Sequence, residues 1–153
     1  MASGVFWFVG SVTVAGVGFL GRAYIMHRGQ CRRECRDQID RATSLVNSIE
    51  EYAVEYYCQS PDAQDAARIA RQISSKLKQL GDRITRINAT LRAEGLLTAV
   101  VAFRRAVSSE LDVQGRRSYA PDDAMFEKIS SSGRMLITKL EREFQHQYGG
   151  FLW

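Results

Sequence analysis

Proline is nearly absent from this sequence, and cysteine and histidine are scarce. Two prolines occur among 153 residues, at Pro61 and Pro121, and helix-favouring residues dominate between them. Three cysteines, an odd number, argue for reduced thiols and against a disulfide framework. The sequence also lacks a phosphate-cradling glycine loop, a nucleophile elbow and a paired metal motif. We therefore predict an all-α protein that is not an enzyme and uses no cofactor.

Charge is missing from the first 21 residues. Residues 5–21 are apolar or small throughout, and residues 2–4 extend the run to the roughly 20 residues that a membrane helix needs. A cleaved signal peptide would carry basic residues before its apolar run and a small-x-small site after it, whereas this run ends at Arg22. The pattern predicts an uncleaved, single-pass transmembrane anchor over residues 1–21.

Small residues form a stripe along this predicted anchor, although Phe8 interrupts it. Such a stripe lets a second membrane helix approach closely and favours association of anchors. Glycine is common in membrane helices in general, so a purely lipid-facing role is the alternative. The stripe consists of Gly4, Ser11, Ala15 and Gly18.

The net charge of +4 is concentrated directly after the anchor. Five arginines and Glu34 account for all of it, and residues 37–153 are neutral. Basic flanks stay on the cytoplasmic side, which predicts an outside N-terminus and a cytoplasmic helical domain over residues 22–153. The neutral remainder argues against nucleic acid as a partner, while the flank itself would contact anionic lipid of the bilayer. These membrane-flank residues are Arg22, Arg28, Arg32, Arg33 and Arg36.

Two heptad patterns predict long helices over about 22–58 and 62–92. Apolar residues alternate steps of four and three from Cys35 to Tyr56, and again from Ala66 through Ala70 to Leu91. The break at 60–62 contains a cap-type serine and a proline, so the second helix should return antiparallel to the first as a hairpin. The spacing does not decide whether the seams pair within one chain or, as a coiled coil, between chains. The seam residues include Ile39, Val46, Ile49, Ile73, Leu77, Leu80, Ile84, Ile87 and Leu91.

Two further helices are predicted over about 95–112 and 122–147, which completes a bundle of three to four helices. Residues 96–103 are apolar nearly all round, and this favours a buried helix, with an interfacial helix as the alternative. The expected stripe of the third helix is Leu96, Val100, Phe103 and Val107. Phe126, Ile129, Gly133, Leu136, Leu140 and Phe144 form that of the fourth, and Gly133 would allow a close neighbour.

Aromatic residues end the chain. In an up-down bundle the fourth helix descends toward the bilayer, where aromatic side chains favour the interface. This predicts an interfacial tail of Tyr148, Phe151 and Trp153, with a frayed terminus or a partner-binding tail as the alternatives.

His27, Cys31 and Cys35 are the best candidates for metal ligands because they are spaced by four residues. On a helix they lie about 6 Å apart in a row, which is too far for one tetrahedral ion. His146 is a conceivable fourth ligand, and Glu143 with His146 has the spacing used in di-iron bundles, but no second such motif occurs. Burial as small core residues, or palmitoylation near a membrane, is the preferred explanation of Cys31 and Cys35. We predict no metal site.

Together these features predict a membrane-anchored helical scaffold, accessory or signal-relaying subunit of a membrane protein complex. It would act through protein–protein contacts, as a homo-oligomer or with other membrane-complex subunits. The chain also resembles phage inner-membrane lysis proteins in size and outline. Their helical rod is periplasmic, which conflicts with the arginine flank. A membrane-permeabilising effector that oligomerises through its anchor is the third reading, supported by the small-residue stripe alone.

Overall fold

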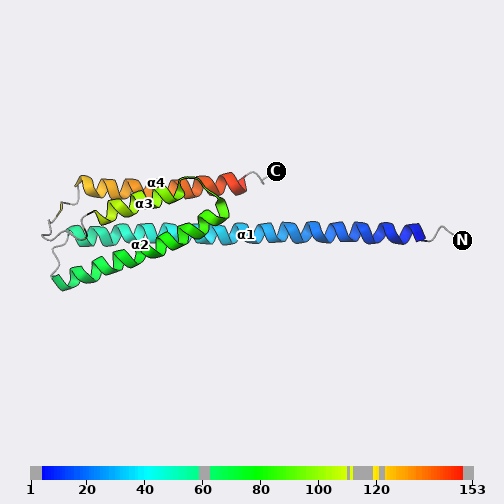
Figure 1. Ribbon diagram of the computed structural model, residues 1–153, viewed down its shortest axis with the longest axis horizontal. Coiled ribbons are helices and arrows are strands. Elements are labelled where there is room, and N and C mark those ends of the chain that lie inside the picture. The colour runs from blue at the N-terminus through cyan, green and yellow to red at the C-terminus, as the bar shows by residue number, and fades with distance from the viewer. Residues whose placement is uncertain (1–4, 59–62, 110, 112–118, 121–122, 150–153) are drawn as a thin grey trace. The chain divides into compact units, whose positions relative to one another are not determined.

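The described part of the chain is entirely helical. The computed structural model describes residues 5–58, 63–109, 111, 119–120 and 123–149, with the helical backbone alone for residues 5–25 and 63. These residues form four helices and no strand, which confirms the predicted all-α class. The helices are α1 (Val5–Cys58), α2 (Ala63–Leu91), α3 (Leu96–Ser108) and α4 (Ala124–Tyr148) (Figure 1).

The chain divides into two compact units, residues 1–34 and residues 35–153. In the second unit the C-terminal part of α1 is followed by α2, α3 and α4, and each helix runs opposite to the one before it (Figure 1). The short connection between α2 and α3 turns at Arg92 and Gly95, which have φ angles of 51° and 76°. Glycine adopts this left-handed region without strain, so Gly95 suits the start of α3.

The core of the second unit is built from the two heptad seams. Every seam position of α1 from Cys35 to Tyr56 is buried, and Ile39, Val46 and Ile49 are fully enclosed. In α2 the pattern differs at one position from the prediction. Ile69 is buried at 1% exposure, whereas Ala70 is only partly buried. Both choices satisfy a step of three or four, and burial of the larger isoleucine removes more apolar surface from water.

The short helix α3 lies in this core. It buries Phe103 completely, together with Leu96 and Val107, while Val100 of the predicted stripe is only partly buried. The helix ends at Ser108, before the predicted residue 112. Two tyrosines of α1 donate hydrogen bonds to backbone carbonyls near this end: the Tyr57 hydroxyl binds Val107, in the last turn, at 2.9 Å, and the Tyr56 hydroxyl binds Leu111, beyond the helix, at 3.1 Å.

Helix α4 begins at a side-chain cap and packs closely on α1. The Asp123 carboxylate accepts a hydrogen bond from the backbone N–H of Met125 at 2.9 Å and so satisfies one free donor of the first turn. Further along, Gly133 is buried. A Cβ atom placed there would lie 3.0 Å from Val46 Cγ1, and closer still to the Glu50 carboxylate. The predicted close approach at Gly133 is therefore confirmed.

The predicted transmembrane anchor gains no support from the structure. In the described part of the chain, no helix is both long enough and apolar enough to cross a membrane. Residues 1–4, and the side chains of residues 5–25, lie outside the described residues. The anchor over residues 1–21 therefore stays a prediction.

Candidate functional site

The residues of both heptad seams are buried inside the bundle. All nine seam residues from Ile39 to Leu91 that the sequence singles out are buried within this one chain. They pack with residues of α3 and α4, so both long helices turn their apolar faces inward. Because buried side chains are inaccessible in the folded unit, any contact with another protein has to use helix faces outside the seams.

The candidate metal ligands do not converge. His27 and Cys31 lie one helical turn apart on α1, with 3.7 Å between Cys31 Sγ and His27 Nε2. Cys35 is buried in the core, and this burial raises the pKa of its thiol. His146 is exposed on α4. Among the described residues, no three His, Cys, Asp or Glu side chains are placed to hold a metal ion.

The arginines of the predicted membrane flank differ in their surroundings. Arg32 and Arg33 are exposed, Arg28 is partly buried, and the side chain of Arg22 lies outside the described residues. Arg36 belongs to the bundle instead, because its guanidinium donates to Glu141 on α4 at 2.6 Å and pairs with Asp40 at 3.0 Å. The hydrogen bond to Glu141 is the main cause that raises the pKa of Arg36.

The predicted interfacial tail and the small-residue stripe of the predicted anchor lie mostly outside the described residues. Gly4, Phe151 and Trp153 are not described, and for Ser11, Ala15 and Gly18 only the helical backbone is. Tyr148 is described and is 9% exposed, with its ring 5.1 Å from that of Phe144. Tyr148 is thus packed in the hydrophobic core, and the interfacial tail stays a prediction.

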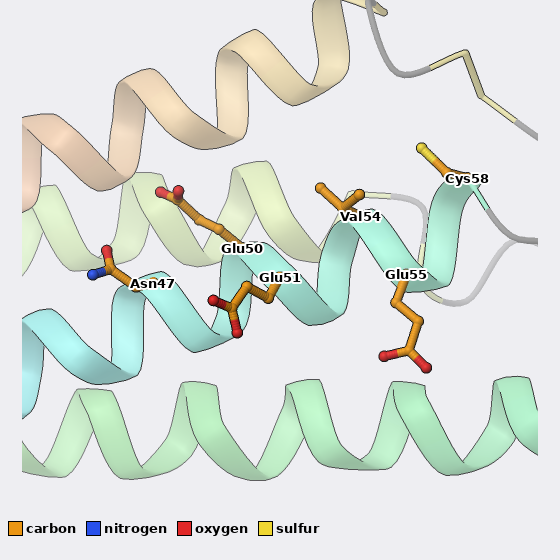
Figure 2. Close-up of a pocket in the computed structure, with 6 residues that line it drawn as sticks. All are labelled: Asn47, Glu50, Glu51, Val54, Glu55 and Cys58. Carbon is orange, nitrogen blue, oxygen red and sulfur yellow. The ribbon is translucent and has the colours of Figure 1, made fainter.

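A groove on the outer side of α1 carries negative charge (Figure 2). Glu50 reaches toward α4, whereas Glu51 and Glu55 point to the other side of the helix. Val54 stands among these carboxylates with 46% of its surface exposed. We call this surface the acidic face, and it is lined by Asn47, Glu50, Glu51, Val54, Glu55 and Cys58.

The fold changes the pKa of Glu50, a residue of the acidic face. Its side chain is partly buried against Gly133 of α4. Desolvation by this burial raises the pKa of the Glu50 carboxyl, and the positive charge of Arg134 opposes the effect. Glu50 is therefore a carboxylate held at a helix–helix contact, next to a surface that stays open to solvent.

A second groove, on the outer side of α4, carries mostly positive charge. Arg134, Lys139 and Arg142 outnumber the one carboxylate, Glu143. Met135 lies in the middle of this surface and is 63% exposed. We call this surface the basic face, and it is lined by Ser131, Arg134, Met135, Thr138, Lys139, Arg142 and Glu143.

Comparison with known proteins finds no likeness: no family model, curated protein or solved structure matches this chain. The two charged faces were also missed by the sequence prediction. The signal for the acidic face is present, since Glu50, Glu51 and Glu55 lie between the seam positions Ile49 and Tyr56. What the sequence does not reveal is that α4 lies alongside α1 with the opposite charge.

Proposed function

We propose that this protein is a membrane-anchored helical scaffold, an accessory or signal-relaying subunit that acts through protein–protein contacts. The observation that carries the proposal is the distribution of polar groups in the bundle. Among the described residues the core contains no buried polar or charged residue, and the charged side chains are exposed or only partly buried. Chemistry on a small molecule usually needs a concave, mostly enclosed site with a few convergent polar groups. Open charged helix faces suit contact with another macromolecule.

In this proposal residues 1–21 hold the protein in the membrane. The proposal rests on the uncharged run of the sequence and on the arginines that follow it. Arg32 and Arg33 are exposed and free to remain in the cytoplasm near anionic headgroups. The helical unit would then present its charged faces on the cytoplasmic side.

Membrane fractionation of the full-length chain tests this proposal. We expect the protein to remain in the membrane pellet after an alkaline wash, while a matched variant lacking residues 1–21 moves to the supernatant. Protease added from the cytoplasmic side should digest the helical unit of the full chain. A chain that the alkaline wash removes would contradict the anchor. A helical unit cut only from the opposite side would contradict the scaffold and favour the lysis-protein topology.

Charge reversal of the flank tests the orientation. Arg36 is unsuitable because it pairs with Glu141 and Asp40, so its replacement would also disturb the bundle. We expect reversal at Arg22, Arg32 and Arg33 to scramble the orientation in the membrane, as read by protease accessibility from the two sides. Unchanged orientation would contradict the role of the arginine flank.

A further inference from the structure

The basic face has the shape of a contact site for another helix. All the residues that line it belong to α4, and each lies in one of two neighbouring rows with a spacing of four residues. Rows of this spacing form ridges on a helix, and the commonest packing of two helices places a ridge of one into the groove between two ridges of the other. Met135 lies in one row, between Ser131 and Lys139, and Thr138 lies in the other, between Arg134 and Arg142.

This groove is open and long enough for such a contact. Five of its seven lining residues are exposed to solvent. Residues 131–143 rise about 18 Å along the axis of α4, which matches about three turns of a partner helix. The side chains of the basic face are therefore accessible along the whole length that a helix–helix contact uses.

The chemistry of the groove combines an apolar side chain with positive charge. Met135 is 63% exposed, and Arg134, Lys139 and Arg142 line the groove around it. Unlike Arg36, these three cations form no salt bridge with another described residue. Methionine and arginine are enriched in protein interfaces, in which an apolar centre has a polar rim. The groove therefore suits a helix that carries an apolar row flanked by carboxylates.

We propose that the basic face binds an acidic amphipathic helix of another protein, with an apolar side chain of that helix on Met135 and its carboxylates beside the three cations. This inference rests on the proposed function and names the chemical class of its partner. The two helices cross at about 50°, as is usual for rows of this spacing. The carboxylates of the partner neutralise the three cations, and Met135 loses its exposure to water.

A second copy of this chain does not supply these carboxylates, although its α1 carries an acidic face. Gly133 lies against Glu50, and Glu141 pairs with Arg36. The basic face thus begins level with the acidic face and extends toward residue 35, whereas the acidic face extends to Cys58. Two copies anchored side by side in one bilayer would hold these faces at different heights. The acidic helix therefore has to come from another protein.

Fluorescence anisotropy with the full-length chain in nanodiscs of neutral lipid tests the proposal. The probe is a labelled synthetic helix with a row of leucines flanked by glutamates, and a matched probe has lysines in place of the glutamates. We expect saturable binding of the glutamate probe, which weakens as the salt concentration rises, and no binding of the lysine probe. Empty nanodiscs correct for binding to lipid. Binding of both probes, or of neither, would overturn the proposal.

Variants of the groove locate the contact. Thr138→Glu with Arg142→Glu places like charge beside the probe and should raise its Kd at least about tenfold. Thr85→Glu with Arg86→Glu makes the same change in charge at exposed positions of α2 and should leave the Kd nearly unchanged. Met135→Ala should raise the Kd at least about fivefold, whereas Met135→Leu, which keeps the apolar volume, should not. Thermal melting shows that each variant is folded, and equal effects of the α4 and α2 pairs would refute the contact.

A photoreactive benzophenone side chain in place of Ser131 identifies the partner in native membranes. We expect a cross-link to an acidic helical segment of another protein, and we expect Thr138→Glu with Arg142→Glu to abolish it. A cross-link to a second copy of this chain, to lipid or to nucleic acid would contradict the proposal.

The outcome is separable from that of the proposed function. A chain that remains in membranes, does not bind the glutamate probe and contacts another protein through a different face refutes the basic-face contact and leaves the scaffold proposal standing. Probe binding by a chain that the alkaline wash removes supports the basic-face contact and refutes the anchor.

Discussion

A missing side chain, at Gly133, sets the distance between α1 and α4. A Cβ atom there would approach Val46 Cγ1 to 3.0 Å and Phe103 Cε2 to 3.2 Å, and would collide with the Glu50 carboxylate. Glu50 can swing away because its carboxylate is the end of a flexible chain. Val46 and Phe103 are fully buried and have little room to move. Gly133 is therefore a position in the core at which alanine is too large.

We predict that Gly133→Ala lowers the free energy of unfolding by about 1–3 kcal/mol, the usual cost of overpacking a core. The effect opposes the helix propensity of alanine, which by itself favours the substitution by up to about 1 kcal/mol. Gly81→Ala on α2 is the matched control, because nothing lies within 4 Å of its added methyl group. Urea unfolding should show Gly81→Ala unchanged or more stable. Equal stabilisation by both substitutions would refute the close contact.

Glu50 makes the stability of the bundle depend on pH. Desolvation raises the pKa of the folded-state carboxyl above its ordinary 4.5, so on acidification the folded state binds the proton before the unfolded state does. Stability should therefore increase as the pH falls through the folded pKa toward 4.5.

Glu50→Gln removes this dependence. At pH 7 this substitution should raise the melting temperature. The gain in the free energy of unfolding should be no more than about 1 kcal/mol, because the group is partly exposed. Glu94→Gln, at an exposed glutamate, is the control. A lower melting temperature for Glu50→Gln would show that attraction to Arg134 outweighs desolvation.

At the scale of the elements, the two long helices were predictable and their partners were not. An unbroken four-three pattern over several heptads indicates the buried face of α1 without knowledge of what covers it. The choice between Ile69 and Ala70 in α2 satisfies the same pattern, so only the packed structure decides it. The end of α3 at Ser108 could not be predicted from local sequence, because the hydroxyl that binds the carbonyl of Val107 belongs to Tyr57, fifty residues earlier.

A charge in the seam of α2 should break the bundle. Ile84 is fully buried, so Ile84→Asp combines the loss of its packing, about 2–5 kcal/mol for truncation to alanine, with the burial of a carboxylate. We expect the second unit to lose cooperative melting by circular dichroism. Thr85→Asp places the same charge one residue away on the exposed side and should melt like the wild type. Normal melting of Ile84→Asp would contradict the burial of the α2 seam in the core.

At the scale of the whole molecule, the bundle separates an apolar interior from charged outer faces. The acidic face lies on α1 alone and the basic face on α4 alone, while the contact between these helices, at Gly133 and Val46, is known only from the folded structure. The sequence therefore allowed an all-α bundle and a protein-binding role to be predicted, but not the surface that would bind. The proposed anchor over residues 1–21 would restrict this surface to partners in, or at, the same bilayer.

The most direct measurement is the mass of the full-length protein isolated gently from its native membranes. Light scattering, corrected for bound detergent, should show an assembly of fixed stoichiometry that is heavier than a single chain of 17.2 kDa. A mass of two or more chains without other proteins would make the chain a homo-oligomer. A stoichiometric companion would make the chain an accessory subunit. A single chain, recovered alone at every concentration, would contradict the claim that this protein works through contacts with other proteins.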